Sequence, residues 1–213
     1  MEITWYGHSC FRLTQRGLAS VVTDPYNHTV VGYSPLKLKA DVVTISHDAP
    51  GHNHLKAVHG VRYVVRGPGE YEIGGVFITG VRTNGRRRKE GEPLNTLYVI
   101  DFDGVTVAHL GDLRRVPTQA EVEALGPVHV LLLPVGGGGS LTPAKAAEVV
   151  NLLEPGIVIP MHYKTPNSPL DLAPLSRFLK EMGVADKEPL PSLKVRPSSI
   201  PDETQVVVLA YRR

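Results

Sequence analysis

The chain has 213 residues and a formal net charge of +2, with 42% hydrophobic and 21% charged residues. This composition fits a globular protein with a buried core and excludes a disordered chain. One cysteine excludes both a disulfide framework and a cysteine-rich zinc site, whereas nine histidines direct attention to metal and proton chemistry. The length predicts one domain over residues 1–213.

The first half of the sequence predicts short strands separated by turns. They are expected at 3–5, 10–13, 19–23, 41–45, 62–66, 71–73, 76–82, 95–101 and 105–109. The second half alternates apolar strands at 128–133 and 157–159 with helices at 117–125, 142–153 and 170–182. Thr142 is expected to cap its helix and Gly183 to end the last one. This order predicts an α/β protein whose sheets are covered by helices.

The sequence offers no membrane segment. No apolar run approaches the about 20 residues that a membrane-spanning helix needs. The N-terminal residues lack the basic and apolar stretches of a secretion signal. We therefore expect a cytoplasmic protein.

Three apolar strands run directly into polar clusters. Residues 42–45 lead into the segment 46–54, which contains His47 and His52. Residues 105–110 lead into Asp112, and 157–160 lead into His162. A fourth segment, 5–10, places His8 in a loop between two strands. Because functional groups are often carried by loops at strand ends, these four segments are predicted to form one site.

These segments resemble the metallo-β-lactamase fold superfamily, close to its ascorbate-6-phosphate-lactonase-like branch of metal-dependent hydrolases. The similarity extends over residues 1–165. Its matching pieces are 5–11, 23–26, the His47 cluster, 67–75, 95–96, 109–113, 134–137 and 159–163. The resemblance implies a four-layer αββα sandwich, with two mixed β-sheets flanked by helices and the site at one edge.

The resemblance also implies seven ligands for two metal ions. The family motif His-x-His-x-Asp-His falls on residues 47–52, where Ala49 and Gly51 replace a histidine and the aspartate. A further histidine of the family is replaced near Gly85. The retained metal ligands that the resemblance implies are His47, His52, Asp112 and His162.

Two interpretations of this reduced set are open. We favour a hydrolase-like protein with an incomplete dinuclear site, little or no metal, and weak or no hydrolytic activity. The alternative is a mononuclear metal-dependent hydrolase of a small phosphorylated or lactone substrate, with one divalent ion at His52, Asp112 and His162. Such a two-histidine, one-carboxylate set suits zinc, and also manganese or iron. Asp48 or His54 is then a candidate substitute ligand.

Arg82 and a basic run, residues 86–89, lie beside the lost histidine position near Gly85. The run is either a solvated surface loop or an element that compensates for missing metal ions. In the second case a guanidinium neutralises Asp112, or Arg86 and His8 contact an anionic small molecule. The third interpretation of function is therefore an anion-binding module that uses Arg86–Arg88. The run is short and has no interleaved aromatic residues, which disfavours nucleic acid as the partner. No stretch of the sequence indicates an oligomeric state.

Supporting roles are expected at three further places in the sequence. Asp24 is expected to help position the site loops, and His109 to support the metal ligands from behind. The glycine run 136–139 is expected to form a turn that lets Ser140 and Thr142 cap the next helix.

Overall fold

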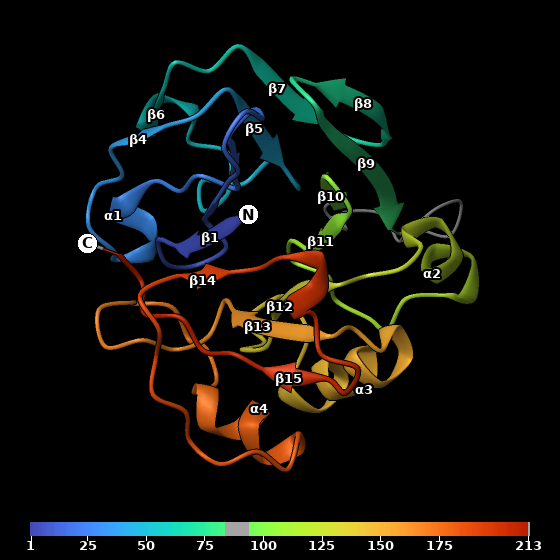
Figure 1. The fold of residues 1–213 in the computed structure, drawn as a ribbon. Coiled ribbons are helices and arrows are strands. Elements are labelled where there is room, and N and C mark those ends of the chain that lie inside the picture. Colours follow the sequence, from blue (N-terminus) through green and yellow to red (C-terminus); the bar gives the residue numbers. More distant parts are fainter. Residues whose placement is uncertain (84–93, 213) are drawn as a thin grey trace.

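The computed structural model describes residues 1–83 and 94–212, and its strands form two mixed sheets and a short ribbon (Figure 1). The first sheet has the order β14 (Leu193–Lys194), β1 (Glu2–Trp5), β2 (Phe11–Thr14), β3 (Val21–Thr23), β5 (Val42–Ile45) and β7 (Tyr63–Arg66). The strands β4 (Leu38–Lys39) and β6 (Val58–His59) form the ribbon. Within the first sheet, β3, β5 and β7 are parallel neighbours and the other pairs are antiparallel.

The second sheet has seven strands. Their order is β15 (Gln205–Val206), β13 (Ile157–Met161), β12 (Val130–Pro134), β11 (Val105–His109), β10 (Asn95–Phe102), β9 (Val76–Thr83) and β8 (Gly69–Ile73). The strands from β11 to β15 are parallel, and those from β8 to β11 are antiparallel. Both sheets are therefore mixed, as expected.

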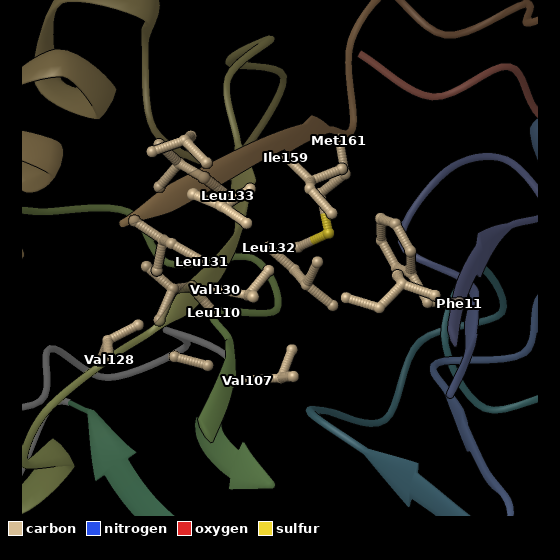
Figure 2. Close-up of a cluster of buried hydrophobic side chains, with 14 of the residues drawn as sticks. Phe11, Val107, Leu110, Val128, Val130, Leu131, Leu132, Leu133, Ile159 and Met161 are labelled. Atoms are coloured by element: carbon tan, nitrogen blue, oxygen red, sulfur yellow. The ribbon is translucent and has the colours of Figure 1, made fainter. Parts of the chain in front are cut away.

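The main core lies between the two sheets and continues behind the second one. Figure 2 shows Phe11 of the first sheet across from Leu132 and Met161 of the second. Strands β12 and β13 are buried at every residue, because one face meets the first sheet and the other meets helices. This double burial explains why their sequences are continuous apolar runs without alternation.

The helices lie outside the sheets. The described part of the chain has the α-helices α1 (His28–Val31), α2 (Gln119–Leu125), α3 (Pro143–Leu153) and α4 (Leu175–Glu181), with 3-10 turns at Leu55–Ala57 and Pro197–Ser199. Helices α3 and α4 cover the second sheet on the side away from the first (Figure 1). Val31 of α1 packs with Val22 and Val43 on the outer face of the first sheet. The layers therefore follow the predicted sandwich.

Two helix predictions need correction at their N-terminal ends. Helix α2 begins at Gln119 rather than 117, because Thr118 caps it and forms a capping box with Glu121. Helix α4 begins at Leu175 rather than 170. The backbone of Ala173 accepts a hydrogen bond from Lys164 and donates one to Gly136, so this stretch stays extended before Pro174.

No helix within residues 1–83 and 94–212 is long and apolar enough to cross a bilayer.

Candidate metal centre

The loops that follow strands of both sheets meet at one edge of the sandwich and bring five predicted site residues together. His47 and His52 follow β5 in the first sheet, whereas Asp112 follows β11 and His162 follows β13 in the second. His8 joins them from the loop between β1 and β2. Arg86 and the rest of the run 86–89 lie outside the described residues.

Asp112 lies among three histidines. One of its carboxylate oxygens is 3.3 Å from Nε2 of His52 and 3.6 Å from Nε2 of His47. The other, Oδ1, is 3.6 Å from Nε2 of His162. The side chain of Asp112 is 15% exposed and those of the three histidines less, so the group opens to solvent mainly beside the carboxylate.

The outer nitrogen of each of these histidines is a hydrogen-bond donor. Nδ1 of His52 donates to the buried carboxylate of Asp24 at 2.8 Å. Nδ1 of His47 is 2.9 Å from the Ser46 hydroxyl, whose own hydrogen is donated to Asp24. The serine oxygen must therefore accept from His47.

His162 follows the same pattern through Ser140. The Ser140 hydroxyl donates to the Gly137 carbonyl at 2.8 Å, so it accepts from Nδ1 of His162 at 3.0 Å. Ser140 therefore orients a site histidine and does not cap α3, which corrects that expectation; Thr142 alone provides the cap. In their neutral forms all three histidines then direct an Nε2 lone pair toward Asp112.

Backbone contacts position the remaining parts of the site. The amide of Asp112 donates to the Asn95 side chain at 3.0 Å, and that side chain donates to the Leu110 carbonyl. His109 donates to the Ser9 carbonyl and accepts from the Gly111 amide, so it joins the loop carrying His8 to the loop carrying Asp112. It holds these loops without bonding to a predicted ligand.

The backbone is strained at three positions of the site. His8, Asp24 and His162 have φ values of +51°, +38° and +52°, the left-handed region that favours glycine. They are three of the five non-glycine residues with positive φ in the described chain. Each such conformation costs on the order of 1 kcal/mol or more, and such strain concentrates at functional sites.

The buried ionisable side chains of this cluster shift one another's pKa values. Burial opposes protonation of His52, but the adjacent carboxylates of Asp112 and Asp24 outweigh it and raise the pKa of His52 to about 10. Burial opposes ionisation of Asp112, yet His52 and His162 hold its pKa well below the ordinary value. Burial lowers the pKa of His8, His47 and His162, so these rings are neutral near pH 7.

The donor set fits a divalent metal ion. Among the described residues, buried Oδ1 of Asp112 has no hydrogen-bond partner. The carboxylate spans two histidines with different oxygens, Oδ2 at 3.3 Å from His52 and Oδ1 at 3.6 Å from His162. In the part of the chain that the structure describes, the sets of three donors that lie within 4.8 Å of one another are His8, His52 and His162, and Asp24, His47 and His52. Asp48, considered above as a substitute ligand, is exposed and accepts a hydrogen bond from Asn53 instead.

Four residues that contribute to the site were not predicted from the sequence. Ser46, Asn95 and Ser140 act on the site through hydrogen bonds that only the fold brings about, although each stands within or next to a motif segment. Arg114 follows Asp112 by two residues and is exposed. Burial is the largest cause of the lowered pKa of His47, and the positive charge of Arg114 adds to it. Arg114 thus supplies positive charge near the open side.

Comparison with known proteins places this chain in a family. The profile of the Beta-lactamase superfamily domain matches residues 2–162. A UPF0173 protein of Pyrococcus abyssi is 29% identical over 189 residues, with coverage of 78% of this chain and 84% of that protein. A UPF0173 metal-dependent hydrolase of Thermococcus kodakarensis is 27% identical over 195 residues, with coverage of 78% and 85%.

A solved structure agrees with these matches. It is that of a candidate Zn-dependent hydrolase of the metallo-β-lactamase superfamily from Thermotoga maritima, 39% identical to this chain. The two superpose with a TM-score of 0.78 over 98% of this chain and 97% of that one. The chain therefore belongs to the Beta-lactamase superfamily domain family, within the metallo-β-lactamase superfamily.

Proposed function

We propose that the protein is a mononuclear metal-dependent hydrolase whose divalent ion is held by His52, Asp112 and His162. One observation carries the proposal: both histidines have Nδ1 committed to an outer oxygen, so their Nε2 atoms are directed to the same carboxylate. Outer partners of this kind orient metal-binding histidines. This favours the mononuclear interpretation over the metal-free one. Two imidazoles and a carboxylate suit zinc, and also manganese or iron.

His47 is the candidate proton acceptor. A metal ion here would supply a Lewis acid for a substrate oxygen and lower the pKa of water. His47 loses its family role when Ala49 and Gly85 replace its partner ligands, and burial keeps it neutral near pH 7. Its Nε2 faces Asp112 at the open side and can take a proton from an attacking water. The lost motif carboxylate predicts slower hydrolysis than in a complete dinuclear site.

The substrate class that we propose is a small anionic ester, either phosphorylated or a lactone. The support is Arg114, the exposed cation near His47. A Cβ atom at Gly139 would lie 3.5 Å from its Nη2 atom, so the guanidinium rests against the glycine turn that precedes Ser140. An anion bound there would lie between this guanidinium and the metal ligands.

Metal analysis tests the proposal. Protein purified without chelator is expected to hold about one divalent ion per chain, measured by mass spectrometry of the metals. His162→Ala is expected to lose that ion, whereas His59→Ala, an exposed histidine of β6, keeps it. A wild-type chain that binds no zinc, manganese or iron even after each is added would contradict the proposal and favour the metal-free interpretation.

Metal binding is also expected to release a proton. The pKa of His52 is about 10 without metal, and a bound histidine must be neutral, so one proton leaves between pH 7 and 8. Zinc affinity should therefore rise about tenfold per pH unit in this window, and titration calorimetry in buffers of different ionisation enthalpy counts the proton. Binding with no proton release would mean that His52 is not a ligand.

The raised pKa of His52 also predicts how the stability of the metal-free protein depends on pH. Because folding raises the pKa of His52 from 6.5 to about 10, its contribution is fully present below pH 6.5. It is lost as the pH rises from 6.5 toward 10. Urea unfolding of metal-free protein at several pH values should show this fall, and metal-saturated protein should not.

A further inference from the structure

The space beside Gly51, where the family carries its aspartate, is filled by another residue. Gly51 is buried, and a Cβ atom built on it would lie 3.0 Å from Nε2 of His8 and 3.5 Å from Cδ2 of the same ring. The His8 imidazole therefore stands where a side chain at position 51 would begin. The absence of a side chain at position 51 therefore leaves room for the ring of His8 in this position.

His8 also lies within reach of the ligand atoms. Its Nε2 is 3.2 Å from Nε2 of His52. The nitrogen donors of His8, His52 and His162 all lie within 4.8 Å of one another and are buried. Two ring nitrogens that face each other at this distance either share a proton or bind one ion between them. The spacing matches that of two neighbouring zinc ligands, about 3.3 Å.

The backbone holds His8 in this position. The carbonyl of His8 accepts a hydrogen bond from the Trp5 indole at 3.0 Å and another from the amide of His162 at 3.2 Å. Its left-handed conformation, with φ of +51°, turns the ring into the cluster. The contact with His162 ties the loop between β1 and β2 to the end of β13, so the backbones of two histidines of the cluster are directly linked.

We propose that His8 is the fourth metal ligand and replaces the aspartate that position 51 lacks. This rests on the proposed function, because it assumes an ion at His52, Asp112 and His162. The exchange alters the chemistry of the site. Three imidazoles and one carboxylate give a divalent site a net charge of +1, where the aspartate would give zero. A nitrogen-rich set of this kind favours zinc over manganese, which prefers oxygen ligands.

Zinc affinity of paired variants tests the inference, measured by competition with a chromophoric chelator. His8→Ala is expected to weaken zinc binding at least about tenfold. Adding Gly51→Asp to His8→Ala should restore affinity and shift the preference toward manganese. Gly51→Asp alone should bind less well than the double variant, because its Cβ meets the His8 ring at 3.0 Å. His59→Ala is the matched control.

Cobalt substitution gives a second readout that does not depend on activity. The visible spectrum of bound Co²⁺ reports the ligand set, and His8→Ala should change it. His8→Asn is a second variant, since asparagine tolerates the left-handed backbone and is too short to replace the ring. Unchanged zinc affinity and cobalt spectrum in both His8 variants, with metal lost in His162→Ala, would overturn this inference alone. Absence of metal from the wild type would overturn the proposed function.

Discussion

The Asp112→Asn variant is expected to bind zinc at least about 100-fold more weakly than the wild type, the upper range for loss of an outer partner of a metal ligand. Asp112 is the carboxylate on which three histidines converge, at 3.3 to 3.6 Å. An amide of the same shape keeps the packing but removes the negative charge. Hydrolysis should fall with metal occupancy, and chelator competition measures the change in affinity.

The same substitution should lower the pKa of His52 in the metal-free protein. The charge of Asp112 is a principal reason why that pKa is raised to about 10, although Asp24 continues to support the protonated ring. NMR titration of the imidazole would follow the change. Asp186→Asn, at an exposed position far along the chain, is the control and should alter neither quantity. Wild-type zinc affinity in Asp112→Asn would exclude Asp112 as a ligand.

Gly136→Ala is expected to destabilise the protein by about 3 kcal/mol and to weaken metal binding as well. A Cβ atom at Gly136 would lie 2.3 Å from the His162 carbonyl and 2.8 Å from Cα of Tyr163. Both contacts are with backbone, so the ends of β12 and β13 must separate and carry His162 away from Asp112. Thermal unfolding should show a loss of about 6–12 °C.

Gly137→Ala is the matched control for this effect. Gly137 has a φ of +69° and open space around its Cα, so alanine there meets only the cost of a left-handed backbone, about 1–2 kcal/mol. Its zinc affinity should equal that of the wild type. If both variants lose stability equally and keep full affinity, the close approach at Gly136 does not position His162.

The parts of the fold that depend on residues close together in the sequence were predictable. Thr142 and Pro143 mark the start of α3 because capping acts within one turn, and the apolar runs of β12 and β13 reflect burial on both faces. The two-residue strands β14 and β15 were not predictable, because each is defined only by pairing with a strand far away in the sequence. The extended backbone before Pro174 was not predictable either, because it depends on the hydrogen bond that Ala173 donates to Gly136.

The site shows the same division. Strand ends predicted that His47, Asp112 and His162 would meet, because functional groups are often carried by loops at strand ends and the resemblance places such loops at one edge of the sandwich. The sequence also predicted that His8 lies in the site, but not its proposed role as a metal ligand, since that role depends on the volume left by Gly51 in a different loop. The contact of Ser140 with His162 was not predictable either. It depends on a hydroxyl whose hydrogen is already donated to the Gly137 carbonyl, so that its oxygen accepts from the histidine.

The left-handed backbone at His8, Asp24 and His162 has an evolutionary consequence. Glycine adopts this conformation without the steric cost, so mutation to glycine at these positions would relieve strain at each backbone. A lineage released from the need for this site would gain from such mutations and from any other loss of buried charge. If the site is used, His8, Asp24 and His162 are therefore expected to persist at these strained positions in related chains.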